Sequence, residues 1–356
     1  MAGLRVLTRQ MSARSRRLVQ LLLSVVLVGA MFLFVFKRID LASVRSEIAR
    51  MTWIESGTIL AVAAWNLMTY LWLWMLVTPG LGVGRSLIVT QSGTAVTNVV
   101  PGGSAIGVGL AYSMFHSWGF SRTRSTVAIL VSGAWNMLIK FGMPVLALVL
   151  LAMQGDVTPQ RVYAAEVGIG LLAASVVGFV FFFRNDDAAR RVGELAGRAV
   201  SWFRRRLRRP APADWAAKFV AFRRGAANLL RRRWPAITVA ALVSHLSLYL
   251  VLLVSLRHVG VTDDQVGWAQ VLAVFALARL LTLVRFTPGG AGATEAVLIG
   301  GLAAAGGDSA RVAAAVLVFR VLTWLLPVPI GVLAYLGWRR GHARAMSPRM
   351  APASTI

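Results

Sequence analysis

The chain has 356 residues, 57% of them hydrophobic, no cysteine and a formal charge of +25 at pH 7. This composition excludes disulfides, thiolate nucleophiles and thiolate metal sites, and it indicates a protein that crosses a membrane several times. Basic residues beside apolar runs are typical of insertion topology and of contact with anionic headgroups, so we expect no nucleic-acid partner. The histidines have no ligand-like spacing, so we expect neither a metal nor a cofactor; they are His116, His245, His258 and His342.

The predicted elements begin with a basic N-terminus at residues 1–17 and a first membrane half at 18–183. A helix needs about 20 apolar residues to cross a hydrocarbon core of about 30 Å. No small-residue cleavage site ends the first apolar run, so we interpret this run as a retained span rather than a signal peptide. The runs of sufficient length in this half are 18–36, 54–77, 125–151 and 162–183.

A basic segment at 184–234 divides the chain and is expected to be a cytoplasmic loop. Its arginines and interleaved aromatic residues favour an insertion signal and a tether to the lipid surface; binding of a partner is the alternative. The second membrane half covers 235–338, with apolar runs at 235–256 and 312–336, and a basic cytoplasmic tail follows at 339–356. The chain is thus predicted to be an all-α polytopic membrane protein with six clear spans.

Pro-Gly-Gly breaks two further apolar stretches near their middle. The stretch 86–118 is broken at 101–103, and the stretch 268–305 is broken at 288–290. Proline removes a backbone donor and clashes with the preceding turn, and glycine adds conformational freedom. Each stretch is therefore predicted to form two helical arms joined by a non-helical elbow, either as a re-entrant hairpin or as a pair of spans.

Lysine and arginine indicate the orientation of the chain. With the N-terminus inside, the inner segments carry far more of these residues than the outer loops do, which is the pattern of cytoplasmic segments. We therefore predict a multi-pass protein of the plasma membrane with both termini in the cytoplasm.

The two broken stretches also indicate an internal repeat. One gapless register superposes 288–290 on 101–103 and pairs Gly306 with Gly119. The turn at Gly119 is predicted inside and the turn at Gly306 outside, so the repeat is inverted in the membrane. Inverted repeats with broken helices recur in secondary transporters, where the irregular backbone lines the substrate site.

The helices that follow the two elbows would point their N-termini at a shared centre. Unpaired backbone N–H groups and positive helix ends favour an anion there, each end by about 0.3 to 1 kcal/mol. The predicted phosphate seat consists of Gly102, Gly103, Gly289 and Gly290. The alternative is that these glycines serve only the close packing of helices.

Charged residues inside apolar runs mark the rest of the candidate site, because a buried charge is unfavourable unless it is paired or hydrated. Arg285 and Glu295 flank the second elbow, and Arg320 lies deep in the last run. Glu295 is expected to brace the elbow or to couple transport, and Arg320 to bind phosphate or to pair with Glu295. Arg279 and Lys140 are further possible site residues, with pairing or snorkelling favoured for Lys140.

No catalytic constellation is visible in the sequence. There is no Ser-His-Asp order, no pair of carboxylates and no acidic metal cluster within the apolar runs. We therefore assign no catalytic residue and expect that the protein is not an enzyme.

The stretch FTPGGAGATEAVLIGGLAAAG, followed by a span with an internal arginine, resembles the flippase-like domain of the lysylphosphatidylglycerol synthase transmembrane family. The earlier stretch NVVPGGSAIGVGLAYSMF is similar to that family's first-half motif, but residues 104–107 contain no acid where the family usually has one. The resemblance covers residues 18–338. The residues of the second motif are Pro288, Gly289, Gly290, Gly292, Glu295 and Ala296.

The resemblance implies a membrane module that handles lipids. Some family members fuse this module to a soluble transferase domain, whereas this sequence is expected to be the membrane part alone. The implied activity is translocation of an anionic phospholipid or of a polyprenyl-phosphate-linked lipid through a central headgroup site. The alternatives are a non-transporting scaffold for a separate lipid-modifying synthase or glycosyltransferase, and a transferase acting on lipids; no oligomeric state is assigned.

Overall fold

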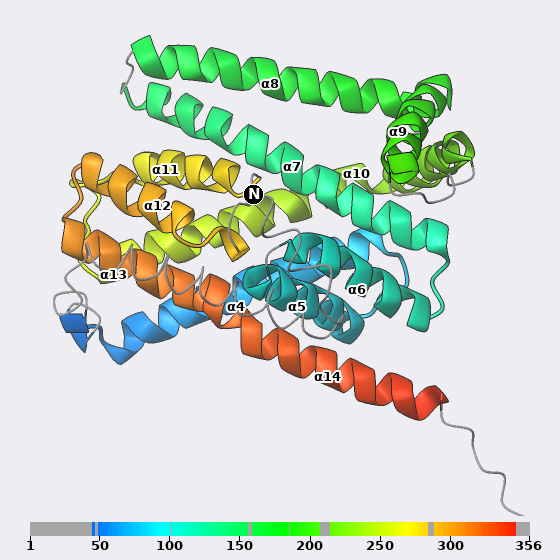
Figure 1. Ribbon diagram of the computed structural model, residues 1–356. Helices are drawn as coiled ribbons and strands as arrows, with labels where there is room; N and C mark the ends of the chain where they lie inside the picture. Colours follow the sequence, from blue (N-terminus) through cyan, green and yellow to red (C-terminus); the bar gives the residue numbers. More distant parts are fainter. Residues whose placement is uncertain are drawn as a thin grey trace, which may run out of the picture.

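A computed structural model of the chain describes residues 45–46, 49–100, 102–155, 159–184, 186–206, 214–283 and 288–346. The regular elements of these residues are all helices, so the predicted all-α class is confirmed (Figure 1). The span predicted at 18–36 lies outside the described residues.

The helices follow one another along the chain with two short irregular turns between them. A 3-10 turn, Pro288–Gly290, forms part of the second elbow, and a π-helical turn, Val321–Leu325, interrupts the last long helix. The α-helices are α4 (Trp53–Val77), α5 (Val83–Val99), α6 (Gly103–Ser117), α7 (Arg122–Met153), α8 (Pro159–Arg184), α9 (Asp186–Arg206), α10 (Trp215–His258), α11 (Trp268–Leu281), α12 (Ala293–Ala304), α13 (Ser309–Arg320) and α14 (Pro327–Met346).

The described residues contain 4 helices long and apolar enough to cross a membrane, or 5 if a bent pair counts as one span. The bent pair is formed by α8 and α9, which meet at 104°, and α8 contains the run predicted at 162–183. The long helices confirm the runs predicted at 54–77, 125–151, 235–256 and 312–336; they are Trp53–Val77, Arg122–Met153, Trp215–His258 and Ser309–His342.

The basic segment 184–234, expected as a loop, is helical over most of its described part. α9 is amphipathic and packs on the start of α10, where a Cβ on Gly193 would lie 2.8 Å from the carbonyl oxygen of Trp215. Asp186 joins the two helices through an ion pair with Arg223 at 2.5 Å. The apolar residues of this segment are too few for a span, but they recur with helical spacing and so form a helix that lies against its neighbour.

α10 lies at the centre of the bundle and runs antiparallel to α4. The Thr58 hydroxyl, near the start of α4, bonds with Nε2 of His258 at the end of α10 at 2.7 Å. In the middle of both helices, Asn66 Nδ2 donates to Ser247 Oγ at 2.8 Å. The end of α4 and the end of α10 are consequently at opposite ends of the bundle.

The main apolar core lies between α10 and the helices of the second membrane half. Phe275 of α11 is 1% exposed and packs edge-on against Phe319 of α13, with 6.4 Å between the ring centroids. Leu252 of α10 and Leu298 of α12 belong to the same buried cluster. This core fixes α11, α12 and α13 on α10.

Two helical hairpins enter the bundle from opposite ends. α5 and α6 form the first hairpin, after the end of α4, and α11 and α12 form the second, after the end of α10 (Figure 1). Their arms contain between 12 and 17 residues. At 1.5 Å per residue, each arm is therefore shorter than a hydrocarbon core of about 30 Å. The predicted form of two arms joined by a break is confirmed for both stretches.

Glycines in the left-handed backbone region form both breaks. Gly102 has a φ of +69° before α6, and Gly289, Gly290 and Gly292 have φ values of +59°, +69° and +84° before α12. Residues with a Cβ are disfavoured in this region, whereas glycine adopts it readily. The second break is the longer one, since α11 ends at Leu281 and α12 begins at Ala293, and three such glycines lie within it.

α14 packs closely on α5 through a glycine. A Cβ on Gly331 would lie 2.1 Å from the carbonyl oxygen of Gln91 and 2.6 Å from Cβ of Ala95. Ser92 Oγ donates to the carbonyl oxygen of Gly331 at 3.3 Å. The backbones of the two helices can approach this closely only because residue 331 has no side chain.

We predict that Gly331→Ala lowers the melting temperature by several degrees, because overpacking of a close helix contact destabilises a protein by about 1 to 3 kcal/mol. Gly337→Ala on the same helix is the matched control, since a Cβ there meets nothing within 4 Å. Thermal unfolding in detergent, followed by tryptophan fluorescence, measures both variants. Equal melting temperatures would contradict the close packing of α14 on α5.

Candidate functional site

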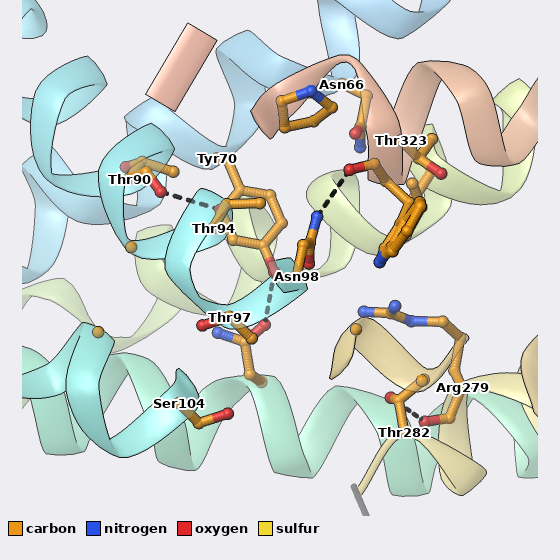
Figure 2. Close-up of a pocket in the computed structure, with 18 of the residues that line it drawn as sticks. Asn66, Tyr70, Thr90, Thr94, Thr97, Asn98, Ser104, Arg279, Thr282 and Thr323 are labelled. Atoms are coloured by element: carbon orange, nitrogen blue, oxygen red, sulfur yellow. Dashed lines mark hydrogen bonds between the residues drawn. The ribbon is translucent and has the colours of Figure 1, made fainter. Parts of the chain in front are cut away.

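A cavity of about 650 Å³ lies in the middle of the bundle, where the two hairpins meet. Its walls come from α4, α5, α6 and α7 on one side and from α11, the second elbow, α12 and α13 on the other. Figure 2 shows hydroxyl and amide side chains of α4 and α5 on one side of this space, with Arg279 and Thr282 of α11 on the other.

α4, α5 and α7 each present polar side chains to the cavity. These side chains recur every four residues, which keeps them on one helical face. The Tyr70 hydroxyl of α4 donates to Oδ1 of Asn136 on α7 at 3.4 Å and so joins two of the walls. The lining residues in these series are Asn66, Tyr70 and Trp74 on α4, Thr90, Thr94 and Asn98 on α5, and Ser132, Asn136 and Lys140 on α7.

Thr282 bonds to the side chain of Lys140 and to the backbone of Arg279, and both of these residues line the cavity. Lys140 is only 7% exposed, and its Nζ donates to Thr282 Oγ1 at 2.9 Å. The Thr282 hydroxyl in turn donates to the carbonyl oxygen of Arg279 at 2.6 Å. Lys140 therefore does not snorkel to a surface, and it enters the cavity from α7 while Arg279 enters from α11.

Glu295 and Arg320 form a buried ion pair. Glu295 Oε1 accepts a hydrogen bond from Arg320 Nε at 2.5 Å, and the two side chains are 6% and 12% exposed. The other oxygen, Oε2, accepts from the Gly292 N–H at 2.6 Å. The start of α12, where we expected a phosphate, is thus capped by the chain's own carboxylate. Glu295 has the geometry of a brace, and Arg320 has that of its partner.

A widened turn follows Arg320 in the middle of the last long helix. Pro327 has no N–H to donate to the carbonyl oxygen of Thr323, so an α-helical turn cannot close there. The π-helical turn Val321–Leu325 takes its place, with the Leu326 N–H donating to the carbonyl oxygen of Val321 at 2.8 Å. Such turns often accompany functional sites because they change the direction of neighbouring side chains.

Gly289 lies where the second elbow meets α5 and this widened turn. A Cβ on Gly289 would lie 2.0 Å from Trp324 Nε1 and 3.2 Å from Asn98 Oδ1, so only glycine fits. Asn98 Nδ2 donates to the carbonyl oxygen of Trp324 at 2.9 Å. The Arg320 guanidinium lies 5.3 Å from the centroid of the Trp324 ring. Asn98, near the tip of the first hairpin, therefore holds α5 against the widened turn, and Arg320 Nη2 donates to the carbonyl oxygen of Gly289 in the second elbow at 3.5 Å.

The cavity brings together most of the residues singled out in the sequence. Gly289, Gly290 and Arg320 line it, together with Arg279 and Lys140. Glu295 lies directly behind Arg320, as its ion-pair partner.

Gly102 and Gly103 do not belong to this group. Gly102 is exposed, and Gly103 packs α6 on α5, where its Cβ would lie 2.2 Å from the carbonyl oxygen of Val96. Neither glycine lines the cavity, and the packing interpretation applies to Gly103. Arg285 belongs to residues 284–287, which lie outside the described residues.

Sequence reasoning missed the hydroxyl side chains of the cavity. For Tyr70, Thr90 and Thr94, the signal that could have found them is the four-residue spacing of polar residues on otherwise apolar helices; the others follow no such series. The residues concerned are Tyr70, Thr90, Thr94, Thr97, Ser104, Thr282, Thr294 and Thr323.

The charge of the cavity is positive. Among the lining residues that the structure describes, Lys140, Arg279 and Arg320 are cationic and none is Asp or Glu. Glu295 offsets one of these charges from behind. Such an excess of positive charge within an apolar bundle suits an anionic ligand. Across the described ranges, no group of three or more His, Cys, Asp or Glu residues could hold a metal ion.

Comparison with known proteins relates the chain to a family through most of its length. The profile described as the lysylphosphatidylglycerol synthase TM region matches residues 19–331. No curated protein matches the chain. The matched range includes both hairpins, Glu295 and Arg320. The chain belongs to the lysylphosphatidylglycerol synthase transmembrane-region family.

Proposed function

We propose that the protein is a flippase-like lipid transporter of the plasma membrane. In this proposal, the phosphate of an anionic phospholipid or of a polyprenyl-phosphate-linked lipid binds in the central cavity, and the headgroup passes from one leaflet to the other without a covalent reaction. The observation that carries the proposal is the positive cavity, lined by Lys140, Arg279 and Arg320. Membership of a family named after a lipid synthase supports a lipid as the substrate.

A phosphate matches the donors of this cavity. Ammonium and guanidinium groups donate charge-assisted hydrogen bonds to phosphate oxygens, each contributing about 1.5 to 3 kcal/mol. Hydroxyl and amide groups such as those of Thr94 and Asn136 can bind the remaining polar atoms of a headgroup. A charged side chain at the centre of a membrane helix is unfavourable by about 2.5 to 3.5 kcal/mol, so an anionic ligand also stabilises the bundle.

The two hairpins suit an alternating-access mechanism. They enter from opposite ends and meet at Asn98 and Gly289, as expected for halves related by an inverted repeat with their broken helices at the midplane. In this proposal, a shift of one hairpin against the other opens the cavity to each leaflet in turn. In this proposal, α9, the basic end of α14 and both chain ends lie on the cytoplasmic side.

A second candidate function is that of a membrane scaffold without transport. The observation in its favour is the ordered pair formed by α9 and the start of α10, which Asp186 joins to Arg223. Such a basic surface fits an acidic face of a separate lipid-modifying synthase or glycosyltransferase.

Transport in liposomes separates the two candidates. The purified protein is expected to speed the movement of fluorescent phosphatidylglycerol or of a polyprenyl phosphate between leaflets, measured by chemical quenching of the label in the outer leaflet. Protein-free liposomes and a labelled neutral lipid are the controls. Absence of any acceleration with a panel of anionic lipids would rule out the transporter and leave the scaffold.

We predict that Lys140→Met slows this movement by about tenfold or more, because a charge-assisted hydrogen bond to the lipid phosphate is lost. Lys218→Met is the matched control, since Lys218 is exposed on α10 and does not line the cavity. Circular dichroism and gel filtration verify that both variants fold. An unchanged rate in folded Lys140→Met protein would remove Lys140 from the site.

We predict that Glu295→Gln lowers the melting temperature. Phosphatidylglycerol is expected to raise the melting temperature of this variant by more than it raises that of the unaltered protein. The variant leaves Arg320 without its acid, and breaking a buried pair destabilises a protein by about 3 to 5 kcal/mol. A lipid phosphate beside Arg320 replaces the missing charge and stabilises the folded state by binding to it.

Glu194→Gln, at an exposed position of α9, is the matched control for this measurement. Melting temperatures are compared in detergent with and without phosphatidylglycerol. If the lipid raised the melting temperature equally in Glu295→Gln and in the unaltered protein, the phosphate would not bind beside Arg320.

A further inference from the structure

Three residues line the cavity and are also exposed on the outside of the bundle. They are Val108 on α6, which is 45% exposed, and Gly133 and Met137 on α7, of which Met137 is 55% exposed. Every other lining residue that the structure describes is buried or half-buried. The cavity therefore opens sideways at the junction of α6 and α7, an opening we call the lateral slot.

The lateral slot is closed at both ends by side-chain contacts. At one end, the hydroxyl of Tyr112 on α6 bonds with the hydroxyl of Thr126 on α7. At the other end, Lys140 Nζ donates to Thr282 Oγ1 at 2.9 Å and ties α7 to α11. Between Thr126 and Lys140, α7 rises by about 20 Å at 1.5 Å per residue. The slot thus has the form of a long window in the side of the bundle.

Polarity changes sharply across the slot. Ser132 and Asn136 face the cavity with Lys140, whereas Gly133 and Met137 each lie one residue further along the helix, about 100° around its axis, at the exposed edge. On the same two helices, the apolar residues Ile106 and Leu130, which do not line the cavity, are 52% and 49% exposed. The inner edge is therefore polar and the outer edge apolar.

We propose that the lateral slot holds the acyl chains of a lipid whose phosphate lies among Lys140, Arg279 and Arg320. This inference rests on the proposed function, which supplies the headgroup, and adds the route of the chains. Moving an acyl chain out of hydrocarbon is unfavourable by about 0.8 kcal/mol per CH₂ group, so the chains remain outside while the headgroup is inside. A soluble anion would need no such window, whereas a lipid requires one.

Gly133 is the position at which the slot can be blocked without disturbing the fold. A Cβ on Gly133 meets nothing within 4 Å, so the backbone there borders open space. We predict that Gly133→Trp slows the movement of labelled phosphatidylglycerol by about tenfold or more, because the indole fills the window. Gly57→Trp is the matched control, since Gly57 is an exposed helical glycine with equally open space and does not line the cavity.

A reversible bridge across the slot tests the same route without a bulky residue. The chain has no cysteine, so the double variant Val108→Cys/Met137→Cys can be linked selectively by a bifunctional methanethiosulfonate reagent. Linking is expected to stop lipid movement and reduction of the linker to restore it. Tyr112→Cys/Thr126→Cys, treated in the same way, ties the helices where they already touch and is expected to change little. If lipid moved at the unaltered rate through both the linked protein and Gly133→Trp, the slot would be rejected while the transport function stood.

Photolabelling tests the slot independently of transport. Phosphatidylglycerol with a diazirine in its acyl chain is expected to label peptides that contain Val108 or Met137, and Gly133→Trp is expected to reduce this labelling. Labelling in a protein that moves no lipid would reject the transport function and keep the slot as a lipid site. Absence of label at both positions would overturn the slot. Efficient disulfide formation between Met137→Cys and a cysteine introduced within residues 18–36 would also overturn it, because the chain itself would then fill the window.

Discussion

The carboxylate of Glu295 connects three elements at the centre of the bundle. One oxygen accepts the Gly292 N–H at the start of α12, and the other accepts the guanidinium of Arg320 at the end of α13. Inside an apolar bundle, an N–H group or a guanidinium without a partner is unfavourable, because little water is present to replace the lost bond. The position of the second elbow, the start of α12 and the direction of Arg320 therefore depend on this one side chain.

Close approaches at glycine bring the first hairpin to the same centre. Gly331 allows the backbone of α14 to rest on α5, and Gly289 leaves room for Trp324 and Asn98 beside the elbow. The hydrogen bond from Asn98 to the carbonyl oxygen of Trp324 then fixes the tip of α5 against the widened turn of the last helix. As a result, residues from both membrane halves share one cavity, and its lining combines three cations with hydroxyl and amide groups.

Local patterns in the sequence predicted the long apolar helices from their length and both breaks from Pro-Gly-Gly. They also predicted the pairing of Arg320 with Glu295 as one of two alternatives, because a charge within an apolar run needs a partner. They did not predict which glycine lines the cavity and which packs a helix, since that depends on how the helices pack. Gly103 meets the backbone of Val96 on the neighbouring arm, whereas Gly289 meets the side chain of Trp324. The polar wall was missed for the same reason, because four-residue spacing defines a helical face but not its neighbour. The helices of the basic segment were missed because the search was for apolar runs long enough to cross a membrane. An amphipathic helix that packs on a neighbouring helix contains no such run.

The ion pair between Glu295 and Arg320 also provides the site with a resident counterion. The buried guanidinium is therefore balanced from within the chain and needs no dissolved anion as its partner. The same carboxylate sets a threshold for any ligand that approaches Arg320. In the proposed transport, a lipid phosphate competes with this carboxylate for Arg320, and it can accept paired hydrogen bonds from the guanidinium, which chloride cannot. Under the proposed function, selectivity for a phosphate over simpler anions would thus follow from an ion pair that is already formed before any lipid arrives.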